Sequence, residues 1–278
     1  MNIMISIKEY AYVLCERELV EGIPSINSVP KNNARPLLDM VNECYHRFSH
    51  KPDVVYIAHS IPFAKGNQME ANIPKSIPVR WLSGIPCAIT HMGLKIATAQ
   101  IQAGKYNRVL VIGTDKAYSD RERRFFGTIM GDAAIGMMIA SGKGLHEIVA
   151  SRLDTVLIAT EGENTDPVLI QKYRDTLPLL LRNAYRDCLS ENGLGSVDYI
   201  APHTPNRDIW DVFSKLVGVD RSLILDDNIY QTGHFNSNDS FYHYFTHCED
   251  GTIKEGKTAM LINTGFGGTR GCTILRRN

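Results

Sequence analysis

Within this 278-residue chain, a cysteine between a short apolar strand and a helix is well placed for nucleophilic chemistry. Cys87 follows a strand expected at 79–82 and a Ser83-Gly84 turn, and a mainly apolar helix expected at 88–104 begins directly after it. Unpaired N–H groups and the positive end of the helix dipole favour thiolate over thiol at such a position. The pattern predicts a nucleophile; the alternative is that Cys87, like many cysteines, packs as a small hydrophobic residue.

Two histidines in the second half of the chain are candidates to act with this thiol. His203 ends an apolar strand and precedes a helix that begins near Arg207, and His234 lies in a polar turn. Imidazole moves protons near neutral pH, so a thiol beside imidazoles suits nucleophilic catalysis. For each histidine the alternative is a polar loop residue without a catalytic role.

The elements that must bring these residues together occur twice. A helix, a turn and a strand containing Tyr56-Ile57-Ala58 recur as a helix, a turn and a strand containing Tyr199-Ile200-Ala201. The later strands 108–113 and 258–263, and 136–140 and 271–275, keep similar displacements. These displacements are close to half the chain length, as a two-fold repeat requires.

The repeat and the apolar strands together predict an α/β fold. Near-continuous apolar strands that alternate with helices indicate strands buried on both faces. We expect two duplicated βαβαβ-type halves, 1–145 and 146–278, with the boundary near 142–148. A pseudo-dyad would place Cys87 and His234 in equivalent strand-to-helix turns at the axis, with His203 in a third converging loop.

Composition excludes several classes of function. The 30 basic and 30 acidic residues leave the chain without a net charge that would attract nucleic acid or a membrane surface. No apolar run approaches the ~20 residues of a membrane span, and the N-terminal residues lack a signal-peptide layout, so we expect a cytoplasmic protein. The six cysteines contain no C-x-x-C pair, which argues against a disulfide framework or zinc knuckle. The charged cluster at 121–124 is typical of a solvated face.

Two histidine pairs have the spacing that can place both rings on one helix face. They are His46 with His50 and His243 with His247. No third ligand is evident for either pair, so we expect surface histidines and no metal.

Four ordered motifs resemble those of the thiolase superfamily, most closely its ketoacyl-acyl-carrier-protein synthase III branch. They are the segment around Cys87, the glycine-rich Gly131-Asp132-Ala133-Ala134-Ile135-Gly136, Pro202-His203-Thr204-Pro205-Asn206, and the loop Asn263-Thr264-Gly265-Phe266-Gly267-Gly268-Thr269. The resemblance runs from about residue 50 to the end. It implies a thiolase-like layered αβαβα sandwich.

The resemblance also implies roles. Cys87 would take an acyl group from a thioester, and a carbanion from a decarboxylating malonyl-type thioester would attack it in a Claisen condensation. The Cys87 N–H and an amide of Gly267 or Gly268 would bind the oxyanion, and His203 would stabilise the enolate. Asp132 is expected to hold backbone amides in its loop.

The sequence departs from this branch where relatives have an asparagine and this chain has His234. A Cys-His-His set is more like the elongating ketosynthases, or like a thiolase with a histidine base. Asn236 and Asn238 lie close by, and a register shift of two to four residues would restore the asparagine. Thr90 and His91 after the cysteine either line the pocket or pack in the core.

The implied partners are acyl thioesters, as acyl-CoA or acyl carrier protein, with no separate cofactor. Relatives hold the adenine of coenzyme A between an N-terminal tryptophan and arginine, and no such pair occurs before residue 50. Arg207 and Lys215 are candidates to dock an acidic carrier protein instead.

Two hypotheses of different classes remain. The preferred one is a ketosynthase-like acyltransferase, with transfer to an amine or hydroxyl acceptor as a variant. The other is a supporting subunit of a heteromeric complex, favoured by the short chain and the unmatched N-terminus. A homodimer or a heterodimer with a related subunit is expected in either case.

Overall fold

A computed structural model describes residues 3–20, 26, 28–60, 72–125, 128–156, 166–205, 207–265 and 267–278. The strands of the first half are β1 (Ile5–Leu14), β2 (Arg17–Leu19), β3 (Ser28–Pro30), β4 (Val54–Ala58), β5 (Val79–Leu82), β6 (Arg108–Asp115), β7 (Arg124–Phe125), β8 (Thr128–Ile129) and β9 (Ala133–Ser141). Those of the second half are β10 (His146–Thr155), β11 (Tyr199–Pro202), β12 (Thr258–Gly265) and β13 (Thr269–Arg277). The helices are α1 (Leu37–His46), α2 (Ile89–Gln102), α3 (Asp120–Arg123), α4 (Pro167–Glu191), α5 (Asp208–Val217), α6 (Ile229–Thr232) and α7 (Asp239–Glu249).

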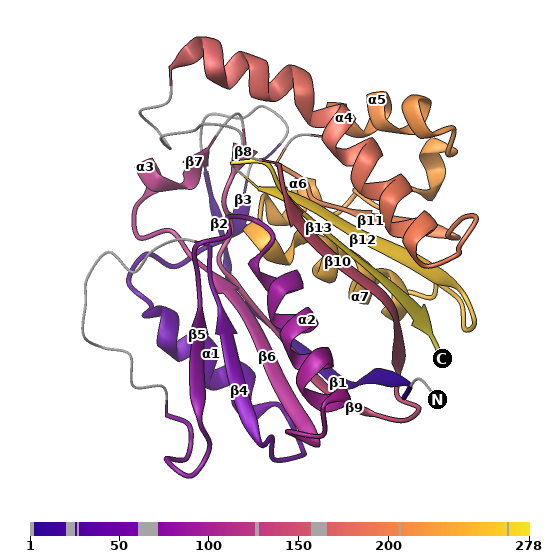
Figure 1. The fold of residues 1–278 in the computed structure, drawn as a ribbon. Coiled ribbons are helices and arrows are strands. Elements are labelled where there is room, and N and C mark those ends of the chain that lie inside the picture. Colours follow the sequence, from indigo (N-terminus) through magenta and orange to yellow (C-terminus); the bar gives the residue numbers. More distant parts are fainter. Residues whose placement is uncertain are drawn as a thin grey trace.

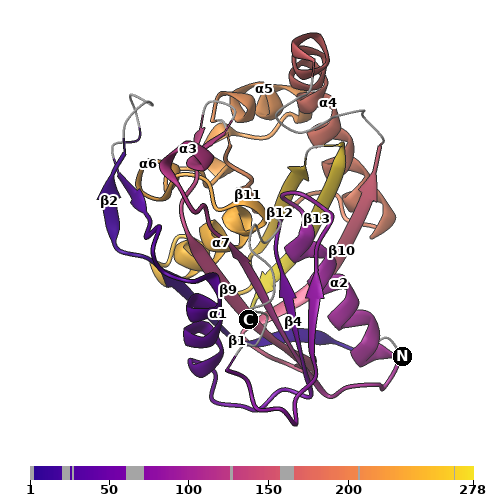
Figure 2. The ribbon, with the colours of Figure 1, turned by 90° about the vertical axis from the view of Figure 1, so that its left-hand side faces the viewer.

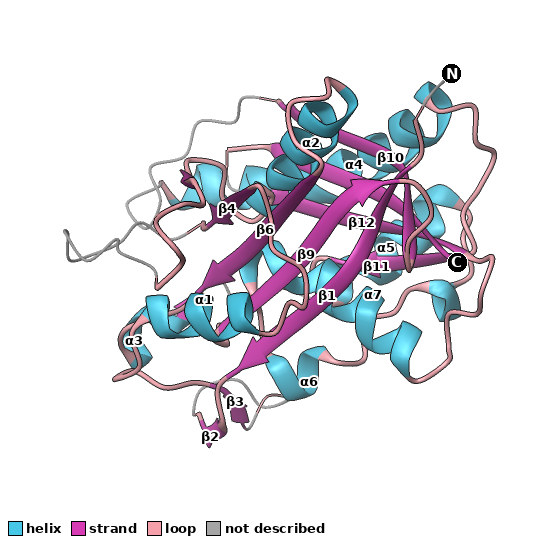
Figure 3. Cartoon of the chain, turned by 90° about the horizontal axis from the view of Figure 1, so that it is seen from below, coloured by secondary structure: helices cyan, strands magenta, loops and turns pink. Residues whose placement is uncertain are grey.

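The main sheet has nine strands in the order β11-β12-β13-β10-β1-β9-β6-β4-β5. The antiparallel pair β1–β10 joins the two halves, and outward from it β9, β6 and β4 on one side match β13, β12 and β11 on the other. Figure 3 shows these strands (magenta) running through the molecule with helices on either side. This symmetric order confirms the α/β fold built from two related halves.

Successive side chains of each strand point to opposite faces of the sheet, and this alternation creates the layers. In β6, Val109 and Val111 face a central core, whereas Leu110 and Ile112 face an outer core formed with α1. In β12, Ala259 and Leu261 belong to the same central core, and the residues between and after them face α4 and α5. Period-two alternation therefore gives each half one outer and one inner apolar face.

The central layer holds α2 and α7. Helix α2 contacts strands of both halves, including β6 and β10, and aromatic residues of α7 pack in the same core. Figure 1 shows α2 (magenta) between the strands of the first half and β10–β13. From one outer face to the other, the layers are therefore α1, the strands of the first half, α2 with α7, the strands of the second half, and α4 with α5. This is the predicted five-layer sandwich.

The turn between β9 and β10 connects the halves. β9 ends at Ser141 and β10 begins at His146, so the predicted division into 1–145 and 146–278 falls in this turn. Both halves share one sheet, and the division into domains stays a prediction. The β2–β3 hairpin projects from the first half (Figure 2). Within the described ranges, no helix is both long and apolar enough to cross a bilayer.

Two expectations about surface groups are wrong. His46 and His50 are exposed as predicted, but His243 and His247 are buried because α7 lies between the sheets. Arg123, in the charged cluster expected to be solvated, is 1% exposed. Its guanidinium binds both carboxylate oxygens of Asp132, at 2.7 and 2.8 Å.

Candidate active site

Cys87 lies in a strained turn between β5 and α2. Its φ is +56°, a region that non-glycine residues rarely adopt. It precedes Ala88, the N-cap of α2, and its N–H donates to Ser60 Oγ at 3.1 Å. Such strain recurs at nucleophile turns because it presents the side chain away from the flanking strand and helix.

The second half supplies an equivalent turn before α7. Asn236 has φ +53°, and Cys87 and Asn236 are the non-glycine residues with positive φ in the described part of the chain. The Cys87 thiol lies 4.0 Å from His234 Nε2 and donates to Asn236 Oδ1 at 3.8 Å. The structure thus brings together Cys87 and His234 as the duplication predicts, and adds Asn236.

His234 is held in one orientation by a carboxylate. Its Nδ1 lies 2.6 Å from Asp239 Oδ2 and, since a carboxylate only accepts, Nδ1 carries a proton; in the neutral ring, Nε2 then presents a lone pair to the thiol. Asp239 also accepts from the N–H groups of Thr204 and Phe235. Burial alone raises the pKa of Asp239, but the attraction of His234 and its hydrogen bond hold that pKa well below its ordinary value. Thiol, imidazole and carboxylate therefore form a nucleophile, base and orienting group.

His203 completes the cluster from the end of β11. Its N–H donates to Ile262 O and its carbonyl accepts from Trp210 Nε1, which fixes the backbone after the strand. Its ring lies 4.8 Å from that of His234, and its Nε2 has no hydrogen-bond partner among the described residues. Burial, followed by the neighbouring His234, lowers the pKa of His203 to about 3, so the ring is neutral.

The thiol is not activated in the way the sequence suggests. Burial raises the pKa of Cys87 well above 9, and the negative charges of Asp115 and Asp239 raise it further. This direction is opposite to the expectation that the helix start favours a thiolate, because Cys87 is 3% exposed and its thiol is desolvated. In this structure the thiol is protonated, and His234 is positioned to accept its proton.

A buried polar network lies behind Cys87. Asn263 Nδ2 donates to Cys87 O at 2.8 Å, and Asn263 Oδ1 accepts from His91 Nε2 and Ser240 Oγ. His91 Nδ1 in turn lies 2.9 Å from Thr273 Oγ1. Thr90 Oγ1 donates to Asn238 Oδ1 at 3.0 Å. His91 and Thr90 are therefore fully buried in polar packing, the second of the two expectations for them.

The glycine-rich C-terminal loop packs against the nucleophile segment. A Cβ at Gly265 would lie 1.8 Å from Pro86 O, so this close approach requires glycine. The Gly268 N–H donates to Gly265 O, and the Cys87 N–H is bound by Ser60. Gly267 is the remaining member of the predicted oxyanion set, and its role stays a prediction. Asn206 and Phe266 lie outside the described residues.

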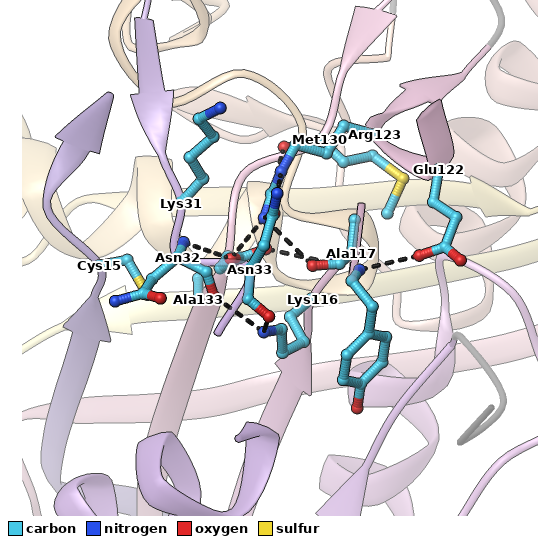
Figure 4. A network of polar contacts seen from close by, with 12 residues as sticks. Cys15, Lys31, Asn32, Asn33, Lys116, Ala117, Glu122, Arg123, Met130 and Ala133 are labelled. Atoms are coloured by element: carbon cyan, nitrogen blue, oxygen red, sulfur yellow. Dashed lines mark hydrogen bonds and ion pairs between the residues drawn. The ribbon is translucent and has the colours of Figure 1, made fainter. Parts of the chain in front are cut away.

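A second network positions the segment that pairs with His234. The His234 N–H donates to Ile129 O and its carbonyl accepts from Gly131 N–H. Arg123 binds Met130 O, while Asp132 accepts from the N–H groups of Asn32 and Ala117. Figure 4 shows Arg123, Asn33, Lys116 and Met130 in this network. Asp132 thus holds backbone amides, as expected, but those of neighbouring segments.

Arg207 is the N-cap residue of α5, and Lys215 lies in the last turn of the same helix. Arg207 binds Asp226 and the Tyr230 hydroxyl, and Lys215 is exposed on α5. A pocket of about 690 Å³ opens beside α5. Its charged lining is made of Arg207, Arg221, His247, Asp208, Asp211, Asp226, Asp227 and Asp250.

Asp239, Asn236 and Asn263 are site residues that sequence reasoning missed or left open. Asp239 carries a weak signal, since it is an acidic residue in the first turn of α7, directly after the histidine turn. Asn263 is the first residue of the glycine-rich loop motif, but the motif does not reveal its role, because its partners Cys87, His91 and Ser240 lie far away in the sequence.

Comparison with known proteins identifies the family. The N-terminal model of 3-oxoacyl-(acyl-carrier-protein) synthase III matches residues 85–156, and the C-terminal model matches residues 189–277. The beta-ketoacyl-(acyl-carrier-protein) synthase III of Rickettsia bellii is 25% identical over 216 residues, which cover 68% of this chain and 65% of the relative. The match therefore spans less than two thirds of that relative's length.

Solved structures share the whole fold. A protein named ChlB3, described as an acyltransferase, has a TM-score of 0.81 at 17% identity, with 99% of this chain and 98% of that chain covered. The 3-oxoacyl-(acyl-carrier-protein) synthase III of Aquifex aeolicus VF5 has a TM-score of 0.79 at 17% identity, with 98% and 99% covered. The two family models together span more than half of the 278 residues, and the chain belongs to the 3-oxoacyl-(acyl-carrier-protein) synthase III family, with its thiolase-like fold.

Proposed function

We propose that this chain is a thioester-dependent acyltransferase that forms an acyl-Cys87 intermediate and condenses it with a malonyl-type thioester. The observation that carries the proposal is the thiol 4.0 Å from a histidine whose other nitrogen is held by Asp239. In the first step the Cys87 sulfur attacks the thioester carbonyl while His234 Nε2 accepts the thiol proton. The leaving thiolate departs and takes that proton back from His234.

The second step needs donors for a developing enolate. Decarboxylation of the malonyl-type thioester releases CO₂ and leaves an enolate, which attacks the acyl carbonyl and expels the Cys87 thiolate; a proton from water then restores the thiol. His203 Nε2 and Asn236 Nδ2 are buried polar atoms without partners among the described residues. A neutral imidazole can carry its proton on Nε2, so both atoms suit the enolate oxygen.

The first experiment incubates the protein with acyl-CoA and with acyl carrier protein thioesters and measures intact mass. We expect one acyl adduct that is absent from Cys87→Ala. An undiminished adduct on that variant, or no adduct on the wild-type protein with either donor, contradicts the proposal.

A second candidate is acyl transfer to an amine or hydroxyl acceptor. The His234–Asp239 pair favours it, because such an acceptor must be deprotonated during attack, whereas an enolate carries its own electron pair. The structural neighbour ChlB3 is also described as an acyltransferase. Isolated acyl-enzyme offered malonyl thioester, or small alcohols and amines, separates the two reactions by their products.

Donor and assembly are further proposals. The carboxylates beside Arg207 give that pocket a negative character, so exposed Lys215 is the better candidate to contact an acidic carrier protein. Lys215→Glu is expected to raise the KM for acyl carrier protein and leave that for acyl-CoA unchanged. Size-exclusion chromatography distinguishes an active homodimer from a subunit that needs a partner. A cytoplasmic location stays a prediction.

A further inference from the structure

Three potential metal ligands converge in the candidate active site. The Cys87 sulfur and one ring nitrogen each of His203 and His234 all lie within 4.8 Å of one another. All three residues are buried, with exposed fractions of 3%, 4% and 0%. Sulfur and imidazole nitrogen without a carboxylate ligand are a donor set that suits zinc and disfavours magnesium or calcium.

The two imidazoles are prepared for such a role. His203 Nε2 is buried without a hydrogen-bond partner among the described residues, so a metal would displace no protein contact there. His234 Nε2 directs its lone pair toward the sulfur because Nδ1 is bound to Asp239. A carboxylate behind a ligating histidine is the usual outer-shell arrangement of zinc sites, and it fixes the ring and strengthens the ligand.

The geometry needs only a small contraction. Zinc bonds of about 2.3 Å to sulfur and about 2.0 Å to nitrogen place tetrahedral ligands about 3.5 Å apart. The sulfur and His234 Nε2 are 4.0 Å apart, and the widest spacing in the cluster is within 4.8 Å. Zinc binding requires the widest spacing to shorten from at most 4.8 Å to about 3.5 Å, and the carboxylate of Asp239 adds negative charge beside a bound cation.

We propose that Cys87, His203 and His234 form a zinc site with three protein ligands and an open fourth position. One zinc ion replaces the thiol proton, which passes to water, and the sulfur–zinc bond removes the nucleophile. Zinc and an acyl thioester therefore exclude each other at Cys87. The binding itself does not depend on the proposed acyl transfer, whereas the inhibition rests on it.

Cobalt(II) is the spectroscopic probe for this site. Protein without an affinity tag is reduced, freed of metal with chelator and titrated with Co²⁺ under anaerobic conditions. We expect one equivalent to give a sulfur-to-cobalt band in the near ultraviolet and the visible absorption of a tetrahedral site. Zn²⁺ is expected to abolish both bands and to block alkylation of Cys87 by iodoacetamide until chelator is added.

Variants assign the ligands. Cys87→Ser is expected to lose the sulfur-to-cobalt band, and His203→Ala and Asp239→Asn to bind Co²⁺ about tenfold or more weakly. Cys15→Ser, which changes another buried thiol, and His46→Ala, which removes an exposed imidazole, serve as matched controls and keep wild-type binding. Circular dichroism and thermal unfolding establish that each variant is folded.

The proposal is overturned by no sulfur-to-cobalt band with cobalt in excess, or by a band that persists in folded Cys87→Ser. Intact mass after incubation with acyl thioester is recorded on the same preparations without metal. A cobalt band without an acyl adduct supports the metal site and refutes the acyl transfer. An acyl adduct without a cobalt band supports the acyl transfer and refutes the metal site.

Discussion

The side-chain amide of Asn263 donates a 2.8 Å hydrogen bond to the main-chain carbonyl of Cys87. The same Nδ2 atom reaches the carbonyl of Asn236 at 3.5 Å. One amide from β12 therefore ties together the two left-handed turns that carry the nucleophile and its partner. Strained conformations persist only where surrounding contacts hold them, and Asn263 supplies such a contact to both.

Replacing Asn263 with leucine, which has similar size, is expected to slow acylation of Cys87 about tenfold. It leaves the Cys87 carbonyl and His91 Nε2 without a partner, at a cost of about 1–3 kcal/mol for each group. Intact mass against time measures the acylation, and urea unfolding measures the stability. Thr273→Val is the matched control, since it removes the other partner of His91 and leaves Cys87 untouched. Equal acylation rates in both variants would refute the role of Asn263.

Asp239→Asn tests the orientation of His234. An amide at this position can donate as well as accept, so it no longer fixes the proton on His234 Nδ1. General-base catalysis by His234 is then lost, which lowers the rate of acylation roughly 10²- to 10⁴-fold. Removal of the negative charge also lowers the pKa of Cys87, so alkylation by iodoacetamide is not expected to fall. A parallel loss of acylation and alkylation would indicate damage to the whole site.

The raised pKa of Cys87 predicts how its reactivity depends on pH. A protonated thiol reacts slowly, so the alkylation rate is expected to climb with pH and to keep climbing above pH 9. The effect of pH on stability has the opposite sign. The unfolded chain releases the Cys87 proton at lower pH than the folded chain does. The contribution of the buried thiol to the free energy of unfolding is therefore lost as pH rises above the ordinary thiol pKa. A rate profile that levels off near neutral pH would contradict the burial of the thiol.

The Arg123–Asp132 pair is expected to be essential to stability. Arg123→Met leaves the Asp132 carboxylate buried with no cation bound to it, which costs about 3–5 kcal/mol. Changing Asp132 to leucine as well removes that charge and is expected to restore part of the loss; full recovery is not expected, because Asp132 also binds two backbone amides. Urea unfolding of the two variants measures the difference. No destabilisation in Arg123→Met would contradict the prediction.

The sequence predicts the layers and half of the site for identifiable reasons. Buried strands such as β6 and β12 contain continuous apolar runs, 109–112 and 259–262, and Cys87 and His203 lie next to strands of the sheet within ordered motifs. The position of His234 beside Cys87 is predicted only by the displacement between the two repeated halves. These signals lie within short stretches of sequence or repeat at a fixed interval, so they can be recognised without a structure.

The remaining features depend on contacts between distant segments. The pKa of Cys87 follows from burial under both halves, which no local pattern records. His243 and His247 have the spacing of a surface pair, but α7 is covered on two sides. Arg123 lies in a charged run, and only its contacts with Asp132 and Asn33 show that it is buried.

The matching backbone conformations of Cys87 and Asn236 have a consequence for how the site is shared between the two halves. Each half supplies one left-handed turn, and a reacting sulfur is needed in only one of them. The turn of the second half keeps the same backbone shape without a thiol, so an amide and a histidine face the sulfur from the symmetry-related position. The nucleophile and its partners are thereby divided between two similar turns of a single polypeptide.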